Sequence, residues 1–286
     1  MERVKFVFRP RDKTLGLGFT TRIMGVVNVT PDSFSDGGKY LETSRAVERC
    51  HQLLDAGADL LDLGGESSRP GARPIPASQE LDRVAPVLER IRPDTSAIIS
   101  IDTYKPEVAY ECLRMGADVI NDITALGHDP KLANLVHGFR AGLILMHMRG
   151  TPETMQTLPP SRDILSEVKM DLTAAIRRAQ DAGLGPEKLL VDPGLGFGKT
   201  FEDNLLILNR LSFFSDLGPI LVGPSRKSFL GKILDQPVDK RTLGTAAACL
   251  IAAARGAHVV RVHDVVEVRE MLQVADAILN EGIREC

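Results

Sequence analysis

The sequence predicts an α/β protein, a (β/α)8 TIM barrel preceded by a short N-terminal extension, on three observations. Eight short apolar segments alternate with helical patterns along the 286 residues, which is the order of a parallel barrel. Each apolar segment ends on residues that can hydrogen-bond or carry charge. The loop after the first segment spans about residues 29–41, whereas most such connections need only about 2–6 residues. A doubly wound sheet is the alternative, but the glycine-rich dinucleotide fingerprint usual after its first strand is missing here.

The composition fits a folded enzyme with a sizeable core, since 43% of the residues are hydrophobic. The formal net charge is -3 and no run of five or six like charges occurs, so we expect neither a nucleic acid nor a membrane as partner. We also expect no signal peptide and no membrane span. The four cysteines show no short paired spacing, which indicates reduced thiols of a cytoplasmic protein rather than disulfides or a zinc site.

The expected strands are the eight apolar segments, at residues 23–27, 60–63, 97–101, 119–120, 143–146, 189–191, 220–222 and 258–262. Helical periodicity occupies the intervals, at residues 43–56, 78–91, 106–115, 130–139, 162–182, 202–211, 225–234, 242–255 and 265–279. Residues 1–20 precede the first strand, and we expect them to form an extension, a hairpin that caps the bottom of the barrel. Residues 21–286 are then expected to form one barrel domain, because no linker or low-complexity stretch interrupts them.

Particular residues justify the ends of several helices. Four glycines each follow a helical pattern, where a left-handed residue often ends a helix; they are Gly57, Gly116, Gly183 and Gly256. Thr43 and Ser78 are the expected N-caps of the first two helices. Pro106 suits the first turn of the third helix.

The residues that follow the expected strands are candidates for one shared site, because all strand carboxyl ends of a barrel meet at one face. They are Asn28, the segment 64–71, Asp102 with Thr103, Asn121 with Asp122, His147, the segments 192–199 and 223–228, and the segment 261–264. The amino-terminal ends of the strands, at 21–22, 58–59, 141–142 and 257, carry fewer polar residues. This asymmetry indicates function, because burying polar groups costs stability unless partners satisfy them.

The polar strand ends divide into two chemical sets. Carboxylates and an amide that could match the N–H and C=O groups of a nitrogen-rich ring are Asp102, Asn121 and Asp192. Donors and positive charge that suit a phosphate or pyrophosphate come from Asn28, Arg69, Arg261 and His263, beside a helix N-terminus expected near Ser225. The sequence therefore predicts a flat heterocycle bound beside a multiply charged phosphate group.

Simpler explanations remain open for several polar residues, because an Asp or Asn at a strand end is often a helix cap. Asp264 is expected to cap the last helix, Asp122 and Asp129 to serve local turns, and Glu66 to support the second loop.

Alternative explanations also apply to the histidines and to the aromatic residues of the loops. His147 could belong to the core or to the site, and the histidines at 51, 128 and 137 are expected to be ordinary. Function is favoured for His263, because Arg261 lies two residues earlier and on the same side of a strand. Phe34 and Phe197 stand in polar or glycine-flanked loops, where an aromatic side chain is expected to line a ligand pocket.

Eight segments in this order resemble the dihydropteroate synthases, a family of pterin-binding barrel enzymes. The segments are 28–38, 64–71, 100–106, 120–123, 146–148, 192–199, 225–228 and 261–264. One such motif would be a weak signal, but eight in order, each at an expected strand end, are specific. The resemblance implies a transferase of folate biosynthesis that joins 6-hydroxymethyl-7,8-dihydropterin pyrophosphate to p-aminobenzoate and releases 7,8-dihydropteroate and pyrophosphate.

The resemblance also implies roles for individual residues. The pterin is expected at Asp102, Asn121, Asp192 and Lys227, with Met146 packing nearby. The pyrophosphate is expected at Asn28, Arg69, Arg261 and His263, together with Mg2+, for which Asn28 is the expected protein ligand. The p-aminobenzoate pocket is expected to comprise Phe34, Ser68, Pro70, Phe197, Lys227 and Ser228. A homodimer formed by helices late in the chain is implied as well, and sulfonamides are expected to compete with p-aminobenzoate.

These residues predict a dissociative, SN1-like substitution. Mg2+, Arg261 and His263 would neutralise the leaving pyrophosphate. Asp102 and Asp192 would stabilise the pterin cation, while loop closure keeps water away from it.

The chain departs from the family pattern at a few positions. Ser68 stands where Thr is common, Arg149 stands where Gln is common, and the segment 158–160 lacks a common Asn-Pro.

Two other functions are alternatives. A methyltetrahydrofolate:corrinoid methyltransferase would share the pterin residues but would handle no pyrophosphate. A non-catalytic homologue should have lost site residues, whereas the matched positions are all present here.

Overall fold

The parallel barrel predicted from the sequence is present. The computed structural model describes residues 3–29 and 38–282. The strands are β3 (Arg22–Asn28), β4 (Leu60–Gly64), β5 (Ile98–Asp102), β6 (Val119–Asp122), β7 (Gly142–Met146), β8 (Leu189–Asp192), β9 (Leu221–Val222) and β10 (Val259–Val262). Their order in the sheet is β8-β7-β6-β5-β4-β3-β10-β9, and a parallel bridge between Val191 and Ile220 joins the two ends into a barrel.

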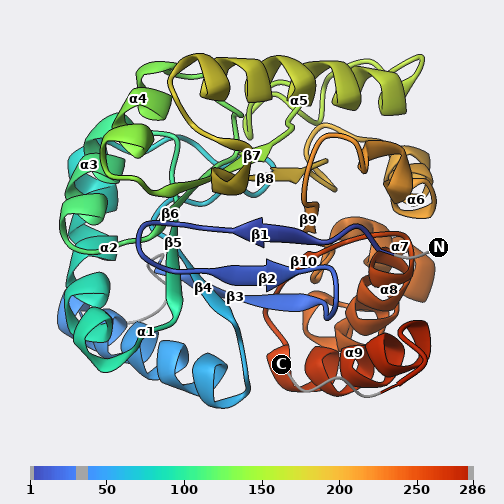
Figure 1. Cartoon of the computed structure of the whole chain (residues 1–286), viewed down its shortest axis with the longest axis horizontal. Coiled ribbons are helices and arrows are strands. Elements are labelled where there is room, and N and C mark those ends of the chain that lie inside the picture. The colour runs from blue at the N-terminus through green and yellow to red at the C-terminus, as the bar shows by residue number, and fades with distance from the viewer. Residues whose placement is uncertain (1–2, 30–37, 283–286) are drawn as a thin grey trace.

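Helices surround this ring of strands (Figure 1). They are α1 (Gly38–Asp55), α2 (Ala77–Ile91), α3 (Pro106–Arg114), α4 (Lys131–Gly138), α5 (Ile164–Asp181), α6 (Phe201–Asn209), α7 (Ser228–Leu234), α8 (Thr242–Ala254) and α9 (Val265–Leu279). Short 3-10 turns are η1 (Arg92–Asp94), η2 (Pro186–Lys188), η3 (Leu211–Phe214) and η4 (Val238–Lys240). Within the described residues, no helix combines the length and the apolar character needed to cross a membrane.

The expected N-terminal hairpin is confirmed. β1 (Phe6–Phe8) pairs antiparallel with β2 (Leu15–Leu17), and the pair crosses the centre of the ring in Figure 1. Phe8 and Leu17 pack on a layer to which each barrel strand contributes one apolar side chain, namely Met24, Leu60, Ile98, Val119, Ile144, Leu190, Leu221 and Val259. The hairpin therefore closes one end of the barrel with apolar contacts.

Some helix ends agree with the sequence analysis and others correct it. The four glycines after helical patterns all have positive φ, between 91° and 104°. The expected N-caps, Thr43 and Ser78, were wrong, because both residues lie inside their helices. α2 begins at Ala77, directly after Pro76, and has no side-chain cap. The helix expected from residue 225 begins at Ser228 instead, since residues 223–227 form a turn.

The expectation that the amino-terminal strand ends are less polar is also wrong. Asp118, just before β6, is buried and pairs with Lys13 at 2.7 Å and Arg92 at 2.9 Å. Arg22 pairs with Asp59 at 3.0 Å, and Asp59 also accepts the backbone N–H of Ile23. These charges are matched within the protein, so they hold the extension and the strand starts together.

A buried histidine links the hairpin end of the barrel to its closing strands. His258 is 2% exposed. Its Nδ1 accepts the N–H of Ile220 at 3.0 Å, and its Nε2–H donates to the carbonyl of Val4 at 2.9 Å. Burial lowers the pKa of His258 to about 4 from 6.5.

We predict that His258 makes the protein acid-sensitive. The neutral ring stabilises the fold above pH 6.5, and that contribution, about 3 kcal/mol, is lost as the pH falls from 6.5 to 4. His258→Asn keeps an acceptor near the position of Nδ1 but does not titrate. The free energy of unfolding of the variant, measured in urea at several pH values, should be lower at pH 7 and fall less steeply in acid. Equal slopes for both proteins would contradict this assignment.

Candidate active site

The guanidinium of Arg261 ties three strand ends together at the mouth of the barrel. Its Nε donates to Oδ2 of Asp62 at 2.6 Å, and Nη2 donates to Oδ2 of Asp102 at 2.8 Å. Asn121 donates from Nδ2 to the same oxygen of Asp62 at 3.0 Å. The set is well buried, with 21% of the Arg261 side chain and none of Asp62 exposed. Arg261, expected at the pyrophosphate, thus lies among the residues expected at the ring.

Several polar atoms in this layer have no partner among the described residues. They are Oδ1 of Asp62, Oδ1 of Asn121 and Oγ of Ser100, each buried. A buried acceptor left unpaired costs about 1–3 kcal/mol, and native proteins contain few of them. The unpaired oxygens of Asp62 and Asn121 therefore suit a bound ring that carries N–H groups.

Asp192 and Lys227 form the second half of the site. Asp192 ends β8 and accepts the N–H of Gly194 at 2.7 Å. Lys227, just before α7, places its Nζ 4.0 Å from the ring centroid of Phe197. Phe197 and Met146 are buried in one small apolar cluster. Lys227 therefore lies where the two expected subsites, for the pterin and for p-aminobenzoate, would meet.

Burial shifts the ionisation of these groups toward neutral pH. It raises the pKa of Asp102 to about 7, against the opposing effect of Arg261. Burial likewise raises the pKa of Asp192 to about 6 and lowers the pKa of Lys227 to about 8. The opposite charges of these two residues partly offset both shifts. Shifts of this kind concentrate at functional sites.

His263 is neutral near pH 7 in this structure. Its Nδ1 and its backbone N–H both lie within hydrogen-bond distance of Ser225 Oγ, at 2.9 Å and 3.2 Å. Burial, together with the nearby charges of Arg261 and Arg226, lowers the pKa of His263 to about 4. His263 therefore offers an N–H donor at neutral pH, rather than the positive charge expected from the sequence.

The remaining expected contacts lie on the rim. Asn28 ends β3 and is exposed, as are Arg69, Pro70 and Ser228, while Ser68 is half-buried. Phe34 lies outside the described residues.

The second loop is fixed by its own supports. Glu66 accepts from the N–H of Ile75, from Tyr104 Oη and from Lys105 Nζ, at 2.8, 2.8 and 2.6 Å. The structural role expected of Glu66 is thereby confirmed. Gly71 further ties this loop to the carbonyl of Pro152, at 2.9 Å.

The turn roles of Asp122 and Asp129 are also confirmed, since each accepts a nearby backbone N–H. Asp264 occupies the N-cap position of α9, as expected, but its side chain makes no cap hydrogen bond. Its carboxylate pairs instead with Arg226, whose Nε lies 3.1 Å from Oδ2.

Three functional candidates were missed by the sequence analysis. Asp62 is the lone acid in an apolar strand, and that isolation was the available signal. Lys105 pairs with both Glu66 and buried Glu80, at 2.6 Å each. Lys199 stood inside a motif but received no role; it donates to His147 and to the carbonyl of Phe197.

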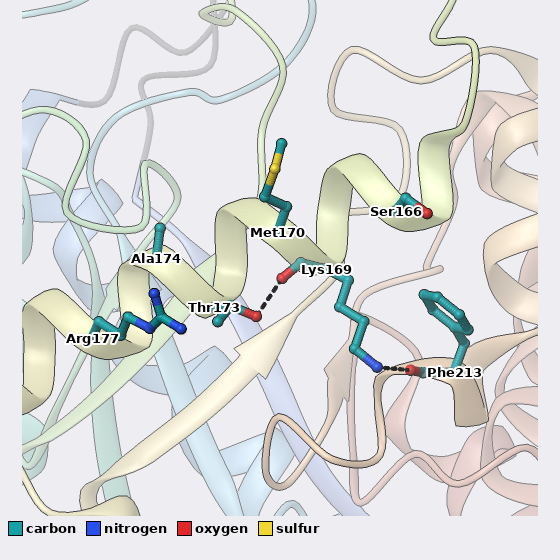
Figure 2. A pocket seen from close by; sticks show the side chains of 7 residues that line it. All are labelled: Ser166, Lys169, Met170, Thr173, Ala174, Arg177 and Phe213. Carbon is teal, nitrogen blue, oxygen red and sulfur yellow. Dashed lines mark hydrogen bonds between the residues drawn. The ribbon is translucent and has the colours of Figure 1, made fainter.

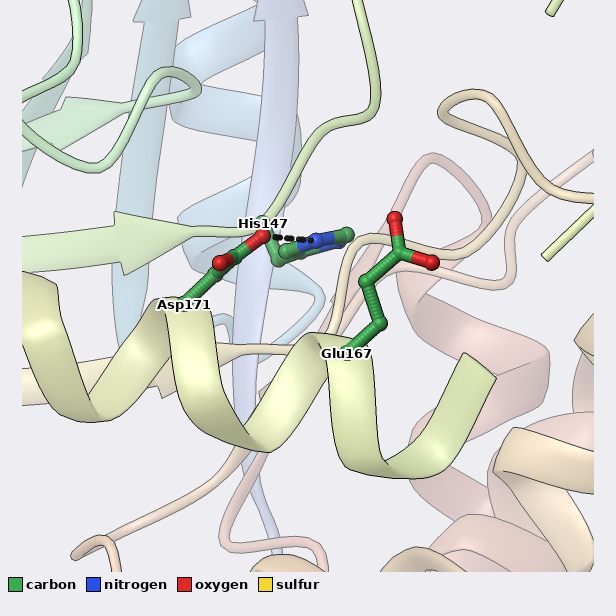
Figure 3. Close-up of side chains that lie close together, drawn as sticks. All are labelled: His147, Glu167 and Asp171. Atoms are coloured by element: carbon green, nitrogen blue, oxygen red, sulfur yellow. Dashed lines mark hydrogen bonds and ion pairs between the residues drawn. The ribbon is translucent and has the colours of Figure 1, made fainter. Parts of the chain in front are cut away.

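His147, Glu167 and Asp171 form a cluster of metal-ligand types, with atoms within 4.8 Å of one another (Figure 3). The ring of His147 already bonds Asp171 at 3.2 Å and Lys199 at 2.9 Å. Glu167 pairs with Arg149 at 2.7 Å. Because protein groups occupy both ring nitrogens, the cluster is explained as a hydrogen-bonded network without a metal.

A separate surface hollow of about 400 Å³ lies against α5 and η3, lined by Ser166, Lys169, Met170, Thr173, Ala174, Arg177 and Phe213 (Figure 2). Lys169 crosses it to donate to the carbonyl of Phe213 at 3.2 Å. No residue expected at the active site lines this hollow.

We predict that Arg261→Lys weakens ring binding, because one ammonium cannot hold both Asp62 and Asp102 in the geometry of a guanidinium fork. Binding of 6-hydroxymethyldihydropterin, measured by calorimetry, should weaken at least about tenfold. Arg226→Lys breaks an Arg–carboxylate pair outside the ring layer and serves as the matched control. Equal affinity in the Arg261 variant and the control would contradict the role of Arg261 in the ring layer.

Comparison with known proteins gives one consistent result. Residues 24–263 match the family model described as pterin binding enzyme. The chain is 42% identical to the dihydropteroate synthase of Bacillus subtilis over 96% of this chain and 95% of that protein.

Solved structures agree with these matches. A Yersinia pestis dihydropteroate synthase with a sulfonamide drug has a TM-score of 0.90 at 39% identity, covering 96% of this chain and 100% of that one. A Burkholderia cenocepacia dihydropteroate synthase complexed with 7,8-dihydropteroate has a TM-score of 0.86, also at 39% identity, covering 96% and 97%.

Proposed function

The chain belongs to the dihydropteroate synthase family of pterin-binding enzymes, and we propose that it joins 6-hydroxymethyl-7,8-dihydropterin pyrophosphate to p-aminobenzoate. The products are 7,8-dihydropteroate and pyrophosphate, and the enzyme is a transferase. The observation that carries this proposal for the chain's own residues is the buried layer of Arg261, Asp62, Asp102 and Asn121, with its unpaired acceptors. Such a layer favours a ring with several N–H groups and disfavours ligands that leave the acceptors unpaired.

Each subsite then has a chemical role. We assign the pterin to Asp102, Asn121, Asp192 and Lys227, with Met146 beside it. The pyrophosphate is assigned to the donors at the rim, which are Asn28, Arg69, the outer side of Arg261 and neutral His263. The p-aminobenzoate is assigned to a pocket comprising Phe34, Ser68, Pro70, Phe197, Lys227 and Ser228.

Mg2+ belongs to the same proposal, with Asn28 as its protein ligand. The side chain of Asn28 offers an amide oxygen on the exposed rim, and Mg2+ prefers oxygen ligands, keeps several waters and binds substrate phosphates. When bound, the ion supplies neutralising charge to the leaving pyrophosphate.

The reaction is proposed to begin with cleavage of the CH2–O bond, whose electron pair leaves with pyrophosphate. The pterin ring delocalises the resulting positive charge, and the carboxylates of Asp102 and Asp192 stabilise it because they are fixed and poorly solvated. The amine of p-aminobenzoate then forms the C–N bond, and its proton passes to the released pyrophosphate. His263 donates its N–H to the leaving group, and no side-chain nucleophile takes part.

The homodimer remains a proposal, supported by apolar side chains on the outer faces of α8 and α9. Leu243 is 82% exposed, and Val274 and Ile278, one turn apart on α9, are 62% and 71% exposed; exposed apolar patches often mark a protein–protein interface. Cytoplasmic placement is supported by free, buried cysteines at 50, 112 and 249. Sulfonamides are proposed to compete with p-aminobenzoate.

The proposed reaction is tested by pyrophosphate release from the purified chain with Mg2+ and the pterin pyrophosphate, with and without p-aminobenzoate. Release that requires p-aminobenzoate and yields dihydropteroate is expected. Failure to release pyrophosphate under either condition, with the protein folded, would refute the synthase.

The ionisation of Asp102 predicts the acid side of the pH profile. The anionic carboxylate is the active form, so kcat/KM should rise with pH through about 7, the pKa of Asp102. Asp102→Asn should lower kcat/KM by about 100-fold or more and move the acid limb down, toward the pKa of Asp192 of about 6. A variant with the wild-type rate and profile would show that Asp102 does not stabilise the cation.

The dimer is tested by charge placed on α9. Ile278→Glu should convert a dimer into a monomer by light scattering, because a carboxylate buried without a partner is costly. Met170→Glu changes an equally open apolar residue on α5 and should leave the mass unchanged. The same mass for all three proteins would contradict this interface.

A further inference from the structure

The ammonium of Lys199 is committed entirely to protein acceptors. Lys199 is 8% exposed and stands just before α6. Its Nζ lies 2.9 Å from His147 Nδ1, 3.2 Å from the carbonyl of His147 and 3.1 Å from the carbonyl of Phe197. An ammonium has three N–H donors, and these three acceptors use all of them. Burial lowers the pKa of Lys199 to about 7, against Asp192, and the three acceptors favour the charged form.

The tautomer of His147 follows from its two neighbours. Nδ1 accepts from Lys199, so the proton of the neutral ring must be on Nε2. Nε2 lies 3.2 Å from Oδ2 of Asp171 on α5, and its N–H donates there (Figure 3). Burial lowers the pKa of His147 to about 3, with Lys199 contributing. The ring is therefore neutral near pH 7, and Asp171 holds it in the tautomer that Lys199 requires.

These bonds join the loops after β7 and β8 where their backbones already touch. A Cβ at Gly194 would lie 1.9 Å from the carbonyl oxygen of His147, and a Cβ at Gly198 would lie 2.5 Å from that of Arg149. Both glycines have positive φ, so other residues are excluded by conformation and by space. The carbonyl of Phe197, which Lys199 holds, also accepts the N–H of Arg149 at 3.4 Å.

The joined loops carry Phe197. Its ring is buried with Met146 and Met155, and it faces the ammonium of Lys227 at 4.0 Å. A shift of the Phe197 backbone would therefore move one wall of the proposed p-aminobenzoate pocket and the face on which Lys227 rests. The ring layer around Arg261 would keep its own bonds.

We propose that Lys199 is a positioning residue for p-aminobenzoate, acting with His147 and Asp171 to hold Phe197 in place. The inference rests on the proposed function, because it takes Phe197 as a wall of that pocket. It assigns a role to a buried lysine whose nitrogen has no donor left for a substrate. The proposal also predicts different effects on the two substrates, since Lys199 should influence the binding of p-aminobenzoate more than that of the pterin.

The test compares Lys199→Met and Asp171→Ala with matched controls. Loss of one buried hydrogen-bonding partner is expected to raise KM for p-aminobenzoate about tenfold in Lys199→Met and a few-fold in Asp171→Ala. The Kd of the pterin pyrophosphate should stay within about twofold in Asp171→Ala. Lys188→Met removes another lysine that holds two carbonyls, those of Arg9 and Arg140, and Asp181→Ala removes another exposed acid of α5. Neither control should change KM.

A spectroscopic readout is independent of turnover. The 15N shifts of the His147 ring should show the Nε2–H tautomer in the wild type and a weaker preference for it in Asp171→Ala, where the ammonium of Lys199 alone still favours it. Asp171 is half-exposed, so this variant should fold even if Lys199→Met does not. An Nδ1–H tautomer in the wild type would overturn the proposal. Normal wild-type turnover with an unchanged KM in folded Asp171→Ala and Lys199→Met would also overturn it, whereas a wild-type chain without turnover would refute the proposed function itself.

Discussion

The site depends on one buried interaction, the guanidinium of Arg261 held between the carboxylates of Asp62 and Asp102. Burial and the neighbouring carboxylate of Asp62 both raise the pKa of Asp102, and the cation of Arg261 opposes them. Arg261 allows them to share the mouth of the barrel, and its planar fork fixes their direction. Asn121 is oriented by the same carboxylate, so the acceptors that face a ligand follow from this one arrangement. A buried ion pair often contributes little net stability. This agrees with ligand binding, rather than stability, as the reason for its presence at this end of the barrel.

The two ends of the barrel show how the same residue types serve different purposes. At the hairpin end, charges such as Asp118 and Asp59 are paired or accept backbone N–H groups, and the apolar layer under Phe8 and Leu17 closes the interior. At the other end, buried oxygens of Asp62 and Asn121 are left without partners among the described residues. The difference between the two ends is therefore one of hydrogen-bond satisfaction, not of polarity. Unpaired acceptors that a ligand can satisfy favour binding, because the cost of leaving them unpaired is relieved only in the complex.

Much of the fold could be predicted because short stretches of sequence determine its strands and helices. Short apolar segments located the barrel strands, and period-3.6 patterns located their helices, to within a few residues. Glycines such as Gly57 and Gly116 marked helix ends that positive φ confirms. The candidate site followed from the rule that strand ends meet. What could not be predicted depends on contacts distant in sequence. Arg261 and Asp62 are 199 residues apart, so neither the pairing nor the role of Asp62 was visible, and Lys199 meets His147 only because two loops touch. Thr43 and Ser78 show the limit of local rules. Both residue types favour the N-cap position, but each helix starts before them, so they lie inside it.

The central claim is that the Arg261 layer recognises the ring of the pterin, and a crystal structure of the chain with 6-hydroxymethyldihydropterin tests it most directly. The account predicts that the ring lies at the mouth of the barrel and that Asn121 Oδ1 and Asp62 Oδ1 gain donors, from the ring or from a water trapped beneath it. Arg261 should keep its bonds to Asp62 and Asp102. A ring bound elsewhere, or one that leaves both oxygens unpaired while Arg261 turns away from the carboxylates, would contradict it.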